Sequence, residues 1–225
     1  HRVHRRQRQM CIRDSPMSLP LITIDGPSAS GKSSVSRLLA QELDWNWVST
    51  GAFYRGLGYV ALQEKISLDD PLALLPLVKD KKWLVEMTAE NTEVIYKGRA
   101  VTQEIHGEEV GAAASQISQW PEIREALLQR QRDCFDSARG LVAEGRDCGT
   151  VVFPQALVKV YLTANPELRA QRRSQEEGTA LASSLKKQQM RDQNDSQRKA
   201  SPLTLAEGAL TIDSSFLSLE EVVHE

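Results

Sequence analysis

Short apolar runs alternate with amphipathic segments along most of the chain. Val35, Leu38, Leu39 and Leu43 recur at helical spacing and predict an amphipathic helix over residues 32–43. Runs that predict strands lie at 21–25, 45–49, 141–144, 158–162 and 209–213. Further helices are expected at 52–63, 71–76, 108–117, 122–134, 166–177, 181–192 and 217–224. This alternation indicates an α/β fold in which helices cover both faces of a parallel central sheet.

One segment departs from that alternation. Residues 82–88 and 93–96 have the pattern of two antiparallel strands, with Glu90 and Asn91 near the turn between them. A third short strand near 100–101 would complete the group. The sequence therefore predicts a small antiparallel insert within the parallel architecture.

The turn after the first expected strand carries the sequence GPSASGKSS at 26–34. Gly26, Gly31, Lys32 and Ser33 fit the phosphate-binding P-loop pattern without a mismatch. The glycines let the backbone wrap a polyphosphate, the lysine reaches its outer phosphates, and the serine hydroxyl can bind Mg²⁺. The alternative is a glycine-serine turn without a ligand, and the flanking strand and helix argue against it. A nucleotide site is therefore predicted here.

Composition and charge narrow the class of protein. The chain has 225 residues and a net charge of −2 at pH 7, so charge gives no reason to expect a nucleic-acid or membrane partner. Cys11, Cys134 and Cys148 form no CxxC pair and are odd in number, which favours a reducing, cytoplasmic location over a disulfide framework. The four histidines show no zinc-ligand spacing, so no structural metal is expected.

Residues 1–16 differ from the rest of the chain. They carry five arginines, one acid and few apolar residues, and Met17 stands just before the first strand. We favour non-native sequence, such as vector or adaptor read-through, with the natural protein starting at Met17. The alternative is a basic arm that binds nucleic acid. It has no aromatic residues for base stacking, which disfavours that alternative.

Arginines recur in the motifs downstream of the P-loop. Arg55 opens the second helix, Arg124 lies in a middle helix, and Arg191 and Arg198 stand near the end of a late charged helix. A lone arginine on a helix is usually solvated surface. Arg146 is different, because it and Asp147 come just past the carboxyl end of an expected core strand, where open α/β sheets bind ligands.

Taken together, these motifs resemble the bacterial cytidylate kinases, a branch of the nucleoside monophosphate kinases. The resemblance runs from about Leu19 to Glu225. The matching pieces are GPSASGKSS at 26–34, TGAFYR at 50–55, AASQ at 113–116, REALLQRQR at 124–132, EGRDCGTVVFP at 144–154 and RDQNDSQRKASPL at 191–203. The P-loop alone indicates only a nucleotide, whereas the GRDCGTVVFP block and the insert point to this branch.

The resemblance implies a P-loop kinase that transfers phosphate from MgATP to CMP or dCMP. Residues implied to hold ATP are Gly26, Pro27, Ser28, Ala29, Ser30, Gly31, Lys32, Ser33 and Ser34, with Ser33 on Mg²⁺. Residues implied to bind the acceptor are Thr50, Arg55, Ser115, Arg124, Arg146, Asp147, Arg191 and Asp195. Those implied to act in catalysis are Lys32, Arg146, Arg191 and Arg198. The acceptor phosphate is already an anion, so this chemistry needs cations rather than a general base, and no histidine is required.

The resemblance also implies a domain plan. The core would comprise 19–81, 109–171 and 196–225, the acceptor-binding insert about 82–108, and a mobile lid about 172–195. A monomer without nucleic-acid or membrane partners is expected. Ser49 and Asn194 depart from the residues common in relatives, and the last helix is shorter than usual.

Two other functions remain open from the sequence. One is a P-loop kinase for a different small acceptor, such as another nucleotide, a sugar acid or shikimate. That reading would give no reason for Ser115, Arg124 and Asp147 to converge. The other is an NTP-binding switch or a nucleic-acid module that uses the basic arm, for which no water-positioning group or partner surface is evident.

Overall fold

The computed structural model describes residues 20–135, 139–198 and 200–225. The basic segment 1–16 and its interpretation lie outside the described residues. Within the described part of the chain, no helix is both long and apolar enough to cross a membrane.

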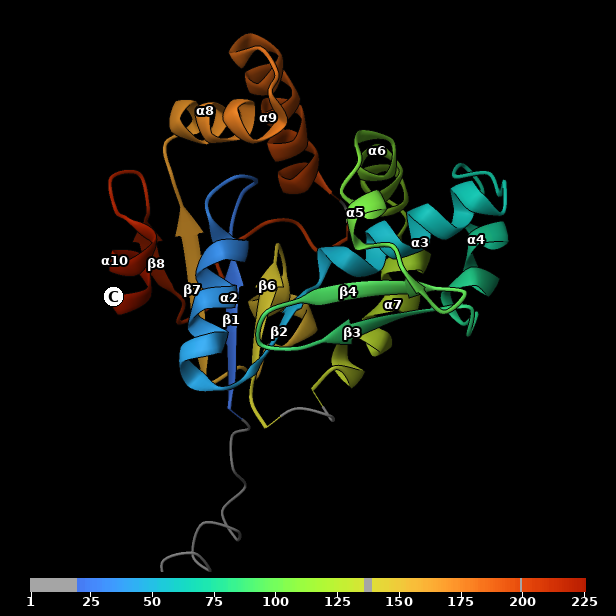
Figure 1. The fold of residues 1–225 in the computed structure, drawn as a ribbon, viewed down its shortest axis with the longest axis horizontal. Coiled ribbons are helices and arrows are strands. Elements are labelled where there is room, and N and C mark those ends of the chain that lie inside the picture. The colour runs from blue at the N-terminus through green and yellow to red at the C-terminus, as the bar shows by residue number, and fades with distance from the viewer. Residues whose placement is uncertain (1–19, 136–138, 199) are drawn as a thin grey trace, which may run out of the picture.

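The centre of the molecule is a parallel five-stranded sheet. Its strands are β1 (Leu21–Asp25), β2 (Asn46–Ser49), β6 (Leu141–Gly145), β7 (Val158–Thr163) and β8 (Leu210–Asp213). They lie in the order β2-β6-β1-β7-β8, and each neighbouring pair is parallel. β1 is therefore the middle strand, and the loops that follow β1, β6 and β7 meet at one edge (Figure 1). The predicted α/β fold with a parallel sheet is confirmed.

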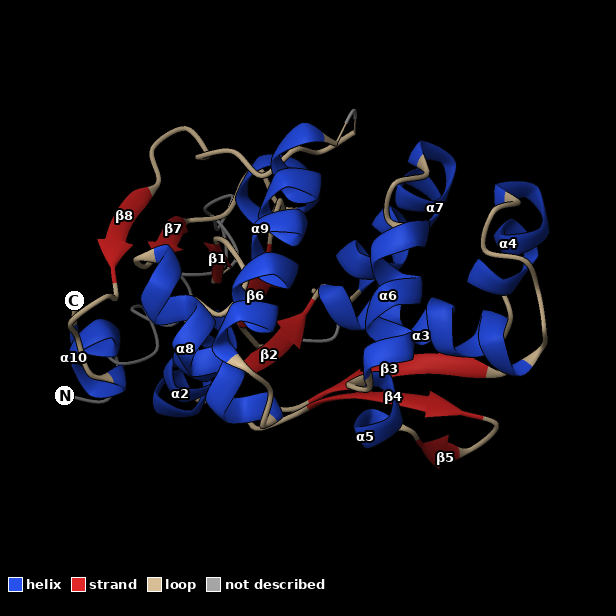
Figure 2. Cartoon of the chain, turned by 90° about the horizontal axis from the view of Figure 1, so that it is seen from above, coloured by secondary structure: helices blue, strands red, loops and turns tan. Residues whose placement is uncertain are grey.

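Helices cover both faces of this sheet because side chains alternate along its strands. Ile24 and Val142 pack with α2 (Lys32–Leu43) and α10 (Leu219–His224) on one face. Leu141 and Ala143 belong to the larger core on the opposite face. Figure 2 shows the same separation from above. The longer helices that contribute to the larger core are α3 (Gly51–Gln63), α4 (Pro71–Val78), α6 (Glu108–Ile117) and α7 (Pro121–Asp133).

The predicted antiparallel insert is present. β3 (Trp83–Met87), β4 (Thr92–Tyr96) and β5 (Arg99–Ala100) form a separate three-stranded sheet in sequence order. The fully buried Trp83 fixes this sheet against α3, where an added Cβ on Gly56 would lie 2.8 Å from the indole ring. The short helix α5 (Thr102–Ile105), which the sequence pattern did not predict, returns the chain to α6.

Two charged helices stand over the carboxyl edge of the sheet. They are α8 (Pro166–Glu177) and α9 (Leu181–Gln197), with Gly178 between them at a positive φ of 62° (Figure 1). The prediction that the second helix ends at 192 was wrong. No glycine or proline interrupts 193–197, and the helix ends where Arg198 takes an extended backbone.

Candidate active site

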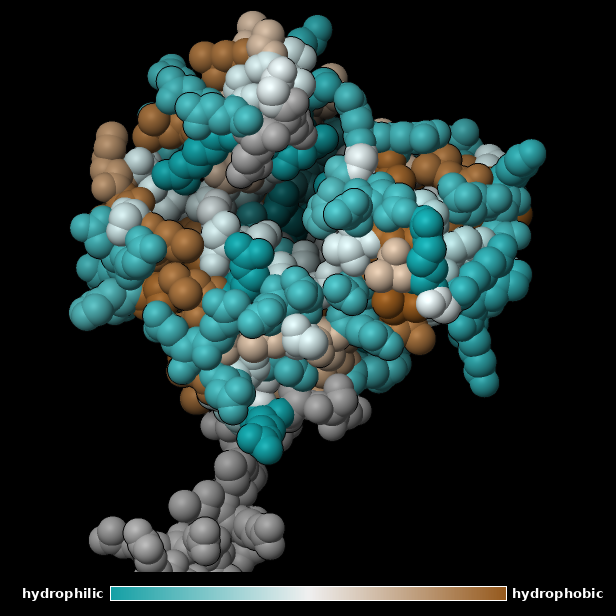
Figure 3. Space-filling model, in the orientation of Figure 1, coloured by the Kyte–Doolittle hydropathy of each residue, from teal (hydrophilic) through white to brown (hydrophobic). Residues whose placement is uncertain are grey.

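A polar cleft of about 310 Å³ opens at the carboxyl edge of the sheet, between the P-loop, α6 and the helices α8 and α9. Figure 3 shows it as a hollow with hydrophilic walls. All residues predicted for acceptor binding line it: Thr50, Arg55, Ser115, Arg124, Arg146, Asp147, Arg191 and Asp195. Ser28, Ala29, Lys32 and Ser33 of the P-loop line it as well, and so does Arg198. The fold thus brings separate sequence motifs to one cavity. Gly26, Pro27, Ser30, Gly31 and Ser34 are not among the lining residues.

The P-loop has the backbone that its glycines permit. Gly26 has φ 152° and Gly31 φ 90°. A Cβ on Gly26 would lie 2.0 Å from the carbonyl oxygen of Leu162, so the loop passes too close to β7 for any other residue. The backbone between the two glycines therefore turns tightly and leads directly into α2.

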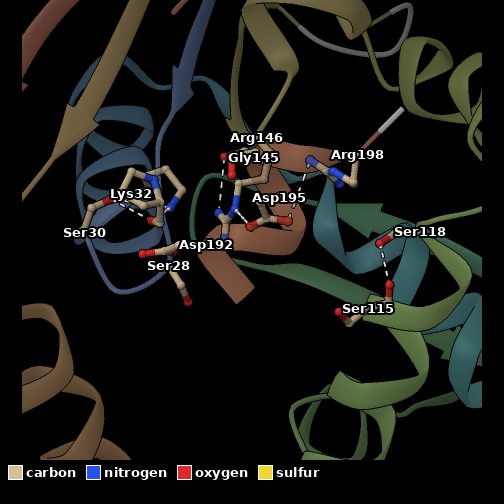
Figure 4. Close-up of polar contacts among 12 residues, drawn as sticks. Ser28, Ser30, Lys32, Ser115, Ser118, Gly145, Arg146, Asp192, Asp195 and Arg198 are labelled. Atoms are coloured by element: carbon tan, nitrogen blue, oxygen red, sulfur yellow. Dashed lines mark hydrogen bonds and ion pairs between the residues drawn. The ribbon is translucent and has the colours of Figure 1, made fainter. Parts of the chain in front are cut away.

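The side chain of Lys32, the first residue of α2, folds back inside this loop. Its Nζ donates a hydrogen bond to the carbonyl oxygen of Pro27 at 2.6 Å and a longer one to Ser30 Oγ at 3.4 Å (Figure 4). Burial, and secondly the charge of Arg146, lower the pKa of Lys32 to about 7. A polyphosphate in the loop would reverse that shift, because it supplies negative charge beside the ammonium group.

Ser33 points towards a carboxylate that the sequence reasoning did not select. Its Oγ donates to Glu144 Oε1 at 3.1 Å. Glu144 is buried in β6, and its position just before the GRD motif at a strand end was the signal that could have identified it. The described residues contain no cluster of three or more His, Cys, Asp or Glu that could hold a metal ion. Mg²⁺ needs only one or two protein oxygens when phosphates and water supply the rest, so this pair fits nucleotide-bound Mg²⁺.

Ion pairs connect the helices above the cleft to its floor. Arg146 Nε donates to Asp195 Oδ2 at 2.7 Å, and Arg198 lies 3.8 Å from the same carboxylate (Figure 4). Arg169 of α8 donates to the Ser28 carbonyl at 3.0 Å and to Asp192 at 2.8 Å. These contacts attach α8 and α9 to the P-loop and to the loop after β6.

Across the cleft, a buried pair forms a hydrogen-bonding wall. Arg124 Nη2 donates to Asp147 Oδ2 at 2.5 Å, and both side chains are less than one-tenth exposed. The ring of Tyr54 lies 5.3 Å from the Arg124 guanidinium carbon, and burial raises the pKa of Tyr54 to about 12. Ser115 lines the cleft from α6 beside this wall. Ser115, Arg124 and Asp147 therefore line the same cleft.

Cations crowd the region between the P-loop and the Arg124–Asp147 pair. Arg55 Nη1 donates to the carbonyl oxygen of Ile105 at 2.6 Å. Burial, and then the charges of Arg173, Arg191 and Arg146, lower the pKa of Arg55 to about 10. Such mutual repulsion is typical of a site that receives an anion.

Sequence reasoning missed four residues of the cleft besides its glycines and small side chains. These are Tyr54, His106, Glu144 and Arg173. Arg173 lies in a helix that was expected to belong to the lid, but no pattern singled it out from the neighbouring arginines. His106 was set aside with the other histidines because none had ligand spacing.

Comparison with known proteins agrees with this geometry. The family model for cytidylate kinase matches residues 22–225. The chain belongs to the cytidylate kinase family. It is 56% identical over 203 residues to a cytidylate kinase of Bdellovibrio bacteriovorus, an alignment that covers 90% of this chain and 94% of the relative. It is 45% identical to a cytidylate kinase of Colwellia psychrerythraea, with 92% and 94% coverage.

The resemblance drawn from the motifs is thereby confirmed. Among solved structures, a gluconokinase from Sinorhizobium meliloti 1021 is similar at a TM-score of 0.45 and 17% identity, covering 92% of this chain and 89% of that one. This similarity is too low to support any conclusion about the acceptor.

Proposed function

We propose that the cleft transfers the terminal phosphoryl group of ATP to the phosphate of CMP or dCMP, as family membership supports. One observation supports the placement of this reaction most strongly. Buried guanidinium nitrogens of Arg124 and Arg198 (Nε of both, Nη2 of Arg198) have no hydrogen-bond partner among the described residues. An unsatisfied buried donor is costly, so these groups favour a ligand that carries acceptor oxygens and negative charge.

In this proposal, the donor lies on the P-loop side. Backbone N–H groups of 26–34 would surround the ATP phosphates, and Lys32 would leave the Pro27 carbonyl to bind the outer ones. Ser33 and Glu144 would hold Mg²⁺ together with those phosphates. Bound Mg²⁺ would neutralise phosphate charge.

The acceptor lies on the α6 side. Asp147 would accept hydrogen bonds from the exocyclic amine of cytosine, while Arg124 and Ser115 would donate to its acceptor atoms. Arg191 and Asp195 would contact the sugar. The acceptor phosphate would then lie among Thr50, Arg55 and Arg146, facing the donor.

Transfer between two anions needs charge neutralisation more than proton removal. Arginine suits this task because it stays charged and binds phosphate oxygens in a bidentate way. Lys32, Arg146, Arg191 and Arg198 would supply positive charge around the transferring group. The segment 172–195 would act as the lid and 82–108 as the acceptor-binding insert, so that closure excludes water and prevents ATP hydrolysis. A cytoplasmic monomer is part of this proposal.

The test is a coupled ADP-release assay with MgATP and a panel of CMP, dCMP, UMP, AMP, GMP and shikimate. Strong turnover confined to CMP and dCMP is expected. Equal or better turnover with a non-pyrimidine acceptor would contradict the assigned acceptor site. Folded protein that binds ATP but phosphorylates none of the panel would contradict the proposed function as a whole.

A further inference from the structure

A histidine that the proposed chemistry does not use lines the cleft. His106 follows α5 and caps it, with its backbone N–H donating to the Gln103 carbonyl at 3.1 Å. The preceding residue, Ile105, is buried in the core, and its carbonyl oxygen accepts a hydrogen bond from Arg55 Nη1. The backbone at His106 is thus held in place. Its imidazole lies near Arg55, which is assigned to the acceptor phosphate.

The charges that face His106 come from three other elements. They are Arg55 of α3, Arg173 of α8 and, more weakly, Glu144 of β6. Partial burial, followed by the two arginines, lowers the pKa of His106, while Glu144 opposes that change. His106 is still in contact with solvent, and these influences favour the neutral form of its imidazole while the cleft holds no anion.

Three acids lie on the adjoining segment, and none of them is among the charges that shift the pKa of His106. Glu104 forms an ion pair with Arg99, Glu108 forms one with Lys187 of α9 at 2.5 Å, and Glu109 is exposed. A ligand anion would therefore be the main negative charge to enter the surroundings of the imidazole.

We propose that His106 is an additional contact for the acceptor phosphate, and that its protonated form strengthens CMP binding; this rests on the proposed CMP kinase function. When the phosphate approaches, the cationic form of His106 is favoured, so binding takes up a proton. Because binding raises the proton affinity of His106, its contribution to CMP affinity grows as pH falls and is lost as pH rises. This assigns His106 to binding, not to proton transfer in the reaction.

Two variants separate the charge of His106 from its shape. His106→Gln keeps a hydrogen-bonding side chain but is always neutral, and His106→Lys is always cationic in a site that binds phosphate. His224→Gln is the matched control, because His224 is exposed in α10 and is not among the residues that line the cleft. Figure 1 shows α10 next to β8, on the other side of the sheet from α6. Steady-state kinetics with CMP and saturating MgATP from pH 5.5 to 8.5 give KM and kcat for each protein.

The expected result is a pH-dependent ratio of KM values. KM of His106→Gln should exceed that of wild type by about fivefold to tenfold at pH 5.5, since one unit of pKa change corresponds to about tenfold. The ratio should fall below about twofold at pH 8.5. His106→Lys should have the lower KM of the two variants at high pH. Taking ratios removes the titration of the CMP phosphate itself, whose second pKa of about 6 is common to all the proteins.

Proton uptake provides a second readout that a structural role would not change. Calorimetric titration of CMP in buffers of different ionisation enthalpy should show fewer protons taken up by His106→Gln than by wild type near pH 6.5. A KM ratio that is constant with pH, or equal proton uptake in the two proteins, would overturn the role of His106 while leaving the kinase function intact. Wild-type protein that neither binds nor phosphorylates CMP would overturn both proposals.

Discussion

The carboxylate of Asp25 accepts a hydrogen bond from the backbone N–H of Gly149 at 2.7 Å. Its other oxygen accepts the N–H of Cys148 at 2.8 Å. Asp25 is the last residue of β1 and directly precedes the P-loop, whereas Gly149 belongs to the turn of π-helix η1 (Cys148–Val152) that follows Asp147. One buried carboxylate thus joins the loop assigned to ATP to the loop assigned to the acceptor.

Asp25 should make stability depend on pH. Burial is the largest influence on this carboxyl and raises its pKa to about 6 from an ordinary 3.8, against the two backbone hydrogen bonds. Since the folded-state pKa is the higher one, the stabilising contribution is full below the unfolded value and is lost as pH rises through 6. Asp25→Asn cannot titrate and does not lose this contribution. Its free energy of unfolding relative to that of wild type should therefore rise by up to about 3 kcal/mol from pH 4 to pH 7.

Urea unfolding at several pH values measures this difference. Asp44→Asn is the control, because the Asp44 side chain is 92% exposed. Parallel stability profiles for wild type and Asp25→Asn would show that this carboxyl has no raised pKa.

Arg146 should be essential for turnover. Arg146→Ala removes a cation that lines the cleft and pairs with Asp195, and loss of one such charge at a transferring group typically lowers kcat by about 10²–10³-fold. Arg139→Ala is the control, since Arg139 is 90% exposed and pairs only weakly with Asp44. The kinetics are to be paired with circular dichroism to verify folding. Turnover of a folded Arg146→Ala within threefold of wild type would remove Arg146 from the catalytic group.

Local sequence patterns predicted most elements because their causes are local. The P-loop needs two glycines, a strand and a helix in succession, and the hydrophobic spacing of α2 is visible without any tertiary contact. By contrast, η1 forms where its N–H groups meet Asp25, a residue more than a hundred positions earlier. The strand order could not be predicted from local sequence either, because pairing between β1 and β6 depends on packing across the whole domain.

The candidate site shows the same division. Arg146 and Asp147 could be placed from the sequence because a strand end is a general location for ligands. Glu144 stands in the motif at 144–154, but its contact with Ser33 appears only once β6 lies beside the P-loop. His106 and Arg173 carry no motif of their own and join the cleft only through the packing of α5 and α8. The family resemblance assigned roles to residues in known motifs. The remaining residues of the cleft could be identified only from the three-dimensional structure.

The insert should be sensitive to the size of residue 56. Gly56→Ala would place a methyl group 2.8 Å from the ring of Trp83, which is fully buried and also stacks with Arg130 at 3.9 Å. Overpacking of this kind costs about 1–3 kcal/mol. Gly51→Ala, at the first residue of the same helix, has its nearest contact at 3.8 Å and is the control for the same substitution without crowding. Chemical denaturation should find Gly56→Ala the less stable of the two, and the reverse order would contradict the tight packing of Trp83 on α3.

Asp147 should set the preference for cytosine over uracil. A carboxylate can only accept hydrogen bonds, which suits the amine of cytosine and repels the carbonyl oxygen that uracil has at the same position. Asp147→Asn can also donate, so kcat/KM for CMP should fall relative to kcat/KM for UMP by about tenfold or more, equivalent to about 1.4 kcal/mol. The change also weakens the pair with Arg124, so turnover with both acceptors should decrease. Competition assays with the two nucleotides give the ratio directly, with Asp44→Asn again as the exposed control. If the ratio in Asp147→Asn stays at the wild-type value, the base is recognised by other residues of the cleft.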